Sequence, residues 1–453
     1  MRRDDLSVSQ ACVDELAERL LEELGAEDDR GLEVAAMSAL MAVGRSVMGK
    51  AFVRADRGEA FREREATWRP AVASNLLVMT MFGRVSVKRH LFRDRRNGPT
   101  RCLITERHEL VNGLWTPAAA KAGAMAISEM SLEGAESFFR NLGVIDASRS
   151  SLLRLGGTLS DAWEADREVN ERVVREATSI PAHAATAVLS LDGVMVMMTD
   201  SDRAARKATT RSRGRQDNSP AGWKEASVGV VSFYDKEGER LQTRRYGRMP
   251  ESDKASTKAW LQAELAHIRT ARPDLAIVAI ADGAANNWTF LERLGADYEV
   301  VDFFHTVEHL HRHTSKAHGA ATLKTQRLVQ QHRHTLLSVP GAARDVFAEL
   351  EAQQRRRRLK RSPKARGEQL TYFQRHTGRM DYATLRANRL PIGSGVTEST
   401  CKLTICDRLR RTGMRWSQRG GQAIITLRAL RASGQFEAGW DRMMDISRHR
   451  LAA

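Results

Sequence analysis

The sequence predicts a mixed α/β protein, and three observations lead to that fold class. Three strand-like segments lie in succession within residues 186–248. A helical segment then alternates with two short apolar strands up to residue 305. Helical patterns fill most of the chain on either side. A three-stranded meander followed by helix–strand units is the order of a ribonuclease H-like fold, which we therefore expect in the centre of the chain.

The overall charge indicates the class of partner. The chain has 453 residues, more than one domain at roughly 100–200 residues each. Its 72 Lys and Arg against 56 Asp and Glu give a net charge of +16. Proteins this basic usually bind a polyanion, most often nucleic acid, and a merely basic surface is the alternative.

Cysteine usage and apolar runs predict the compartment. Cys12, Cys102, Cys401 and Cys406 show no Cys-x-x-Cys spacing, which favours a reduced, cytoplasmic and nucleoid-associated protein. Cys401 and Cys406 lie five apart on a predicted helix and are expected to point in different directions. The longest uninterrupted apolar runs are shorter than the ~20 residues that span a bilayer, so no membrane association is expected.

Residues 1–115 are predicted to form a helical region with a basic β-hairpin that binds DNA. Apolar and basic residues alternate over 75–94 on either side of Phe82-Gly83, which indicates the hairpin. Its candidate DNA contacts are Arg84, Lys88 and Arg89.

Residues 116–180 contain two short helical patterns that are separated by Asn141-Leu142-Gly143-Val144. Asp146 or Ser148 could cap the second of them. A helix-turn-helix with residues 149–155 as recognition helix fits this pattern, and so does an ordinary helical hairpin.

The expected ribonuclease H-like core begins at about residue 181, and its first part is predicted to run to residue 305. Strands are expected at 186–200, 225–235, 240–248, 275–284 and 298–305, with helices after the third and fourth. Residues 306–390 are predicted to form a helical insertion. Residues 391–453 then supply a core helix, which carries Glu398, and a helical tail.

Three carboxylates are candidates for a site that binds divalent metal. Asp192 lies among apolar residues in mid-strand, where an unpartnered carboxylate costs several kcal/mol. Asp282 follows an apolar strand, at the end of a sheet. If the first and fourth strands are neighbours, these two carboxylates meet, and Glu398 approaches from its helix. Two Mg²⁺ ions held by such oxygens, about 3.5–4 Å apart, suit phosphoryl transfer. Asp200 and Asp302 are further carboxylates to consider.

Four segments resemble bacterial insertion-sequence transposases of the ISKra type, which are relatives of the Mutator-like DDE transposases. They are SLDGVMV, AIADGAANNW, VVDFFHTVEHL and PIGSGVTESTCKLTICDRLRRTGMRW, and the resemblance spans about residues 185–432. It implies that Asp192, Asp282 and Glu398 are the catalytic residues and hold two Mg²⁺ or Mn²⁺ ions. It also implies a helical insertion before the final Glu.

The resemblance further implies a Cys-or-Asp-x-x-His signature, which Asp302 and His305 match as active-site support. His305 could also be a plain structural histidine. Relatives often carry a cysteine-rich, zinc-ribbon-like element after the N-terminal hairpin, but here that region has only Cys102. No structural zinc is therefore predicted.

Two basic segments are predicted to contact DNA phosphates, although a solvated face is the alternative for the second. One follows the Asp192 strand and the other lies in the insertion. Their candidate residues are Arg206, Lys207, Arg211, Arg213, Arg355, Arg356, Arg357, Arg358, Lys360 and Arg361.

The expected function is transposition of an insertion sequence. The resemblance implies recognition of double-stranded terminal inverted repeats, cleavage at each end, joining to target DNA, and a homo-oligomer. A DNA-binding regulator without catalysis and a nuclease that does not join strands are the alternatives.

Overall fold

The computed structural model describes residues 9–24, 29–63, 65–94, 98–199, 222–356 and 363–452. The chain divides into two compact units, one formed by Met1–Ala162 with Trp440–Ala453 and the other by Trp163–Gly439. The finer domain boundaries expected near residues 115, 180, 305 and 390 stay predictions.

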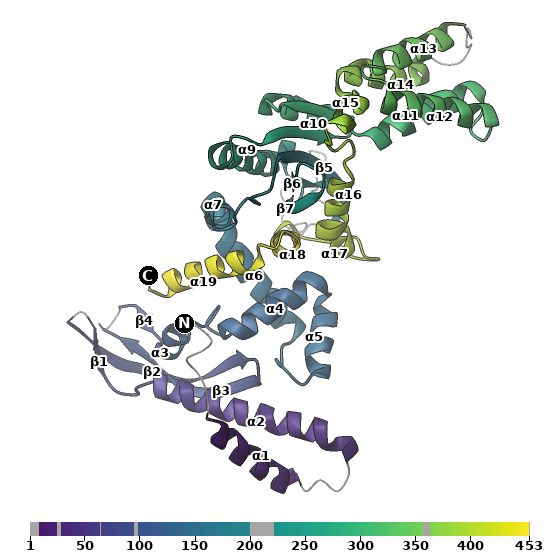
Figure 1. The fold of residues 1–453 in the computed structure, drawn as a ribbon. Coiled ribbons are helices and arrows are strands. Elements are labelled where there is room, and N and C mark those ends of the chain that lie inside the picture. Colours follow the sequence, from purple (N-terminus) through teal and green to yellow (C-terminus); the bar gives the residue numbers. More distant parts are fainter. Residues whose placement is uncertain are drawn as a thin grey trace, which may run out of the picture. The chain divides into compact units, whose positions relative to one another are not determined.

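The first unit contains a sheet with the strand order β1-β2-β3-β4 and several helices (Figure 1). Its elements are α1 (Gln10–Leu24), α2 (Asp29–Ala55), β1 (Phe61–Glu63), β2 (Ala66–Thr80), β3 (Gly83–Arg93), β4 (Thr100–Arg101), α3 (Leu103–Arg107), α4 (Pro117–Glu129), α5 (Leu132–Asn141), α6 (Arg149–Ala165) and α19 (Phe436–Ala452).

The predicted hairpin is present as β2 and β3. The two strands are antiparallel, and the pairing closes at Thr80 and Gly83. Gly83 has φ 101, a conformation that favours glycine in a tight turn. On the inner face, Phe52 of α2 packs in one core with Val78 and Val87, because alternate residues of each strand are apolar.

The α2 helix is long and apolar enough to cross a bilayer over Gly31–Ala55, where an 18-residue window has a mean hydropathy of 1.3. The prediction from uninterrupted apolar runs overlooked it, because charged residues such as Glu33 and Lys50 break the run. One helix of this kind does not identify a membrane protein, since core helices and leader segments share its length and composition.

The second helix pattern of residues 116–180 is α6, and Ser148 caps it. The Ser148 hydroxyl accepts a hydrogen bond from the backbone N–H of Ser151 at 3.3 Å. This confirms one of the two predicted caps. Whether the α5–α6 pair reads DNA bases stays a prediction.

The second unit is built on a sheet with the strand order β7-β6-β5-β8-β9. Its main elements are α7 (Arg167–Ala177), β5 (Thr186–Met198), β6 (Gly222–Tyr234), β7 (Arg240–Arg248), α9 (Ala255–Ala271), β8 (Ala276–Ala281), α10 (Ala285–Leu291), β9 (Tyr298–Val301), α11 (Phe303–His318), α12 (Leu323–Ser338), α13 (Ala343–Arg356), α14 (Pro363–His376), α15 (Tyr382–Ala387), α16 (Gly395–Thr400), α17 (Asp407–Leu409) and α18 (Gln418–Ala432).

This sheet has the predicted element order. Strands β5, β6 and β7 form an antiparallel meander, while β8 pairs with β5, and β9 with β8, in parallel. Consequently β5 lies between β6 and β8, which makes the first and fourth strands neighbours. The apolar runs that predicted β5 and β8 are buried in one core that also includes α9 and α10.

Glycines mark the two faces of the sheet where helices come close. On one face, a Cβ on Gly229 would lie 3.1 Å from Trp260 of α9. On the other face, a Cβ on Gly247 would lie 2.5 Å from Ile425 of α18. Strand alternation and the Asp192–Val228–Gly247 register place Asp192 on the α18 face. The sheet therefore has helices on both faces, as in other α/β folds.

Residues 306–390, which are predicted to form a helical insertion, contain most of α11 and all of α12–α15. Figure 1 shows α11–α14 gathered as one group of green helices, and their role as an insertion stays a prediction. Beyond it, α16 continues into one π-helical turn, Cys401–Cys406. Such turns are rare and occur frequently at functional sites.

Candidate active site

Asp192 lies on β5, and Asp282 directly follows β8, the neighbouring parallel strand. The β5–β8 pairing runs from Thr186 with Ala276 to Leu189 with Ala279. Each Asp comes three residues after the last of these pairs, so continuing the same register sets Asp192 against Asp282. The sequence-based expectation that these strands bring the two residues together agrees with this register.

The environment of Asp192 disfavours its ionised form. Burial raises the pKa of Asp192, the backbone N–H of Gly193 opposes this, and the nearby carboxylate of Asp282 raises the pKa further. The Gly193 N–H donates to Asp192 Oδ1 at 2.7 Å, and the Cys401 thiol lies 3.8 Å from Oδ2. Two adjacent carboxylates in a partly buried site are stabilised by a bound cation.

The loop and helix that follow β8 hold Asp282 through three hydrogen bonds. Asp282 Oδ1 accepts from the backbone N–H of Ala284 at 3.1 Å and from Asn287 Nδ2 at 3.3 Å. Trp288 Nε1 donates to the Asp282 carbonyl at 2.6 Å. These bonds fix one carboxylate oxygen, while Oδ2 accepts none from the residues that the structure describes.

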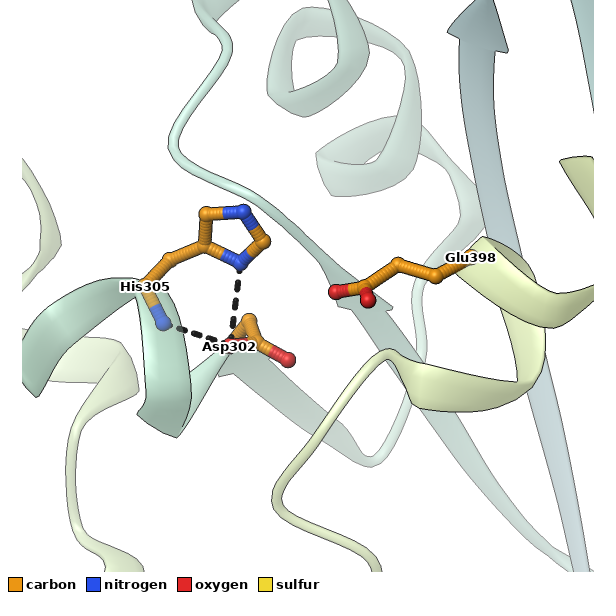
Figure 2. A group of neighbouring side chains, drawn as sticks. All are labelled: Asp302, His305 and Glu398. Atoms are coloured by element: carbon orange, nitrogen blue, oxygen red, sulfur yellow. Dashed lines mark hydrogen bonds and ion pairs between the residues drawn. The ribbon is translucent and has the colours of Figure 1, made fainter. Parts of the chain in front are cut away.

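Glu398 is carried by the short helix α16, which is attached to β5. Thr397 Oγ1 donates to Ser190 Oγ at 2.8 Å, two residues before Asp192 on the same face of the strand. The Glu398 carboxylate is exposed, and within the described parts of the chain it accepts no hydrogen bond. Figure 2 shows it reaching from α16 toward Asp302 and His305.

Asp302, His305 and Glu398 form a close group whose nearest ligand-type atoms lie within 4.8 Å of one another. Asp302 is fully buried, but protein donors already saturate it. Its Oδ1 accepts from the His305 backbone N–H at 2.7 Å and pairs with His305 Nδ1 at 3.1 Å. Its Oδ2 accepts from the Ser394 hydroxyl at 2.9 Å and from the Ser394 backbone N–H. Asp302 therefore fits a positioning role, joining α11 to the turn before α16, better than metal ligation.

His305 is a cation at neutral pH. Its hydrogen bond to Asp302 raises the pKa of His305 to about 9. A protonated imidazole donates from both nitrogens and cannot ligate a metal, but it can contact a phosphate or a carboxylate. This supports the view of His305 as active-site support.

The oxygen donors available at the site fit a hard divalent cation. Asp282 Oδ2 and the Glu398 carboxylate have no donors among the described residues, and Asp192 Oδ2 has only a weak thiol partner. Mg²⁺ prefers such carboxylate oxygens and keeps several waters. The group within 4.8 Å contains Glu398 but neither Asp192 nor Asp282, so the three predicted ligands are not brought into one contact cluster.

Several site residues were missed by sequence reasoning. Asn287 and Ser394 hold Asp282 and Asp302, and both lie in motifs that had been singled out for their neighbours. Cys401 and Cys406 were expected to point in different directions on an α-helix, but a π-helical turn forms there. In such a turn residues five apart are hydrogen-bonded neighbours, and the Cys406 thiol contributes to raising the pKa of Cys401, after burial and Asp192.

Two of the three predicted DNA-binding residues of the hairpin have local partners. Arg84 pairs with Asp146 at 3.1 Å, and Arg89 donates to Ser74 Oγ at 3.1 Å. Lys88 lines an open groove between α2 and β3, together with Lys50 and Arg54.

Most of the other predicted DNA contacts fall outside the description of the structure. Arg355 of α13 is exposed and pairs with Glu351 at 3.3 Å. Arg356 ends the same helix, and its side chain is not described. The remaining candidates lie outside the described residues, and they are Arg206, Lys207, Arg211, Arg213, Arg357, Arg358, Lys360 and Arg361. Asp200, the further carboxylate considered above, also lies outside them.

Trp288 and Trp416, two tryptophans near the motifs, are held by internal contacts. Trp288 is buried, and the Arg379 guanidinium lies 4.1 Å from its ring centroid. Trp416 bonds through its backbone to Met197 and lies beneath Arg408, whose guanidinium is 5.0 Å from the ring centroid. Both contacts favour a packing role over base stacking.

Of the three comparisons with known proteins, the comparison with solved structures gave a match. No protein-family model matches the sequence, and no curated protein matches it. Among solved structures, the chain is similar to one in the "Drosophila P element transposase strand transfer complex", with a TM-score of 0.27 and 13% identity, over 70% of this chain and 79% of that chain. Likeness at this level carries no functional conclusion, so function rests on the geometry of the site.

Proposed function

We propose that this chain is a DNA transposase of the DDE type, with a ribonuclease H-like core, and that it cuts and joins DNA with divalent metal. The observation that carries the proposal is the parallel pairing of β5 with β8, whose register, continued by three residues, sets Asp192 against Asp282, with the Glu398 helix bonded to β5. The strand order β7-β6-β5-β8-β9 supports the core assignment. The ISKra-type motifs support the family.

The proposed site uses Asp192, Asp282 and Glu398 to hold two Mg²⁺ or Mn²⁺ ions. Bound there, the ions supply a template for nucleophile and leaving group and neutralise charge on the phosphate. Asn287 and the Ala284 N–H orient Asp282, and the Thr397–Ser190 bond orients the Glu398 helix. The His305 cation contacts the DNA phosphate, and Asp302 keeps His305 protonated and in place.

The basic residues of the hairpin and the two basic segments bind double-stranded DNA at the terminal inverted repeats and at the target. Two ends have to be processed together, which a homo-oligomer would accomplish. No structural zinc is part of this proposal, and the protein acts in the cytoplasm at the nucleoid.

The test is Mg²⁺-dependent cleavage and joining on a supercoiled plasmid that carries the DNA flanking the coding sequence on both sides. Asp192→Asn, Asp282→Asn and Glu398→Gln should each lower both reactions by about 10³-fold or more, and DNA binding should persist. Asp274→Asn is the control, since this exposed carboxylate pairs with Arg272 among the residues that the structure describes.

Any other outcome of this experiment would indicate a different function. Cleavage without joined product indicates a nuclease. DNA binding without cleavage by the wild type indicates a regulator. Carboxylate variants that retain wild-type activity would overturn the metal site.

A further inference from the structure

Lys254 lies beside the candidate site, although the proposed function assigns it no role. It precedes α9, and its side chain is only 16% exposed. Asp253 and Lys254 both have φ 53, so two successive non-glycine residues adopt the left-handed conformation. That conformation is uncommon for long side chains and concentrates at functional sites.

The Lys254 ammonium connects β6, the strand next to β5, with α10, the helix after the Asp282 turn. Its Nζ lies 3.0 Å from Glu225 Oε1 on β6 and donates to Asn287 Oδ1 on α10 at 3.2 Å. Asn287 in turn donates to Asp282 Oδ1 at 3.3 Å. Lys254 also acts on Asp192, whose pKa its charge lowers against the larger effect of burial.

Gly193, the residue after Asp192, makes room for this arrangement. A Cβ at Gly193 would lie 2.1 Å from Glu225 Oε1, so any other residue would displace the Glu225 carboxylate. Strand alternation puts Gly193 and Glu225 on the α9 face of the sheet, opposite to the Asp192 side chain, so Glu225 holds Lys254 against the backbone next to Asp192.

Lys254 has capacity for one more partner. An ammonium group has three N–H donors, and the described residues accept two of them. Lys254 is a largely buried cation with a spare donor, next to carboxylates that suit divalent metal. Its positive charge complements the negative charge of a phosphodiester bound at these carboxylates.

We propose that Lys254 is a catalytic residue that binds a non-bridging oxygen of the scissile phosphate, with Glu225 and Asn287 as its positioning residues. This inference rests on the proposed DNA-cleaving function. In the alternative, Lys254 only balances the charge of the carboxylates, and it makes no contact with substrate.

The first test is single-turnover cleavage of the plasmid substrate in Mg²⁺. Lys254→Met should lower the rate by about 10²–10³-fold, the effect of removing one donor to a reacting oxyanion. Lys254→Arg should retain more activity than Lys254→Met because it keeps the charge. The matched control is Lys258→Met, since Lys258 lies on α9, is equally 16% exposed, and pairs with Asp253 instead of with Glu225 and Asn287.

The second test separates substrate contact from a structural role. Once wild-type cleavage has mapped the scissile phosphate, that phosphate is replaced by an uncharged methylphosphonate, and DNA affinity is measured in EDTA. Lys254→Met should weaken binding of the phosphodiester duplex about tenfold and binding of the methylphosphonate duplex by less than about twofold. This coupling is measurable even if the variant is less stable, provided that it folds at the assay temperature.

The outcomes distinguish this inference from the function on which it rests. If wild type cleaves and Asp192→Asn does not, but Lys254→Met matches Lys258→Met in both tests, then Lys254 has no contact with substrate and the inference is wrong. Equal loss of affinity for both duplexes also overturns it. If wild type does not cleave, the proposed function itself fails.

Discussion

At the scale of single residues, both carboxylate oxygens of Asp302 already accept hydrogen bonds from protein donors, and these bonds set its role. It begins α11 and also binds Ser394 in the turn before α16, two elements far apart in the sequence. Because its hydrogen bonds favour the ionised form, the pKa of Asp302 lies below its ordinary value despite burial. The ion pair with His305 should therefore contribute to stability in a pH-dependent way.

The sign of that dependence follows from His305. Its pKa is raised from 6.5 to about 9 in the folded state, so the stabilisation is fully present below pH 6.5 and is lost as the pH rises through 9. Its size is on the order of 1 kcal/mol, because the side chain is partly exposed and solvent screens the pair. The difference in melting temperature between wild type and His305→Asn should be a few degrees at pH 6.5 and should shrink by pH 9.5.

Thermal unfolding across this pH range measures the effect. His311→Asn, on the exposed side of the same helix, controls for loss of an imidazole from α11. A difference between wild type and His305→Asn that is constant with pH would falsify the assignment of a charged pair.

At the scale of elements, α14 packs directly on the turn that carries Asp282. A Cβ at Gly283 would lie 2.2 Å from Tyr372 Cε2, and Tyr372 is itself buried and bonded to Thr306 at 3.2 Å. Gly283→Ala should cost about 1–3 kcal/mol of stability, as overpacking does. It should also reduce Mg²⁺-dependent cleavage, because relief of the clash moves the Asp282 turn.

Unfolding in urea and the plasmid assay test this together. Gly378→Ala is the matched control, since nothing lies within 4 Å of its Cβ. Shortening the ring by Tyr372→Leu in the Gly283→Ala background should recover part of the activity. If Gly283→Ala behaves like Gly378→Ala, the insertion does not set the position of Asp282.

The elements that could be predicted are those with a periodic apolar pattern. Strands β5 and β8 are continuous apolar runs, so Asp192 within one and Asp282 just after the other were conspicuous. The turn that places Lys254 has no such pattern, because two left-handed non-glycine residues in succession leave no signature in the sequence. The π-helical turn escaped prediction for the same reason, since it differs from an α-helix only in hydrogen bonding.

At the scale of the whole molecule, the two units differ in how the chain builds them. Trp163–Gly439 is one continuous segment with its own core, whereas the other unit needs Trp440–Ala453 in addition to Met1–Ala162. In the returning segment, Trp440, Met443 and Met444 are buried, with 6%, 3% and 5% of their surface exposed. Burying each large apolar side chain contributes roughly 1.5–3 kcal/mol.

Removal of residues 440–453 should therefore destabilise the first unit by several kcal/mol and leave the second nearly unchanged. Hydrogen exchange read by mass spectrometry measures each unit separately: faster exchange is expected in residues 61–107 and unaltered exchange in β5–β9. Arg448→Ala is the control, since its exposed pair with Glu109 is worth about 0–1 kcal/mol. Equal loss of protection in both units would contradict the division.

The returning segment also sets an order in time during synthesis. Residues 440–453 leave the ribosome only after all of Trp163–Gly439 has been made, a delay on the order of tens of seconds at about 5–20 residues per second. The first unit thus stays incomplete while Trp163–Gly439 is translated. A nascent or prematurely terminated polypeptide consequently lacks the segment that completes the unit containing the β2–β3 hairpin.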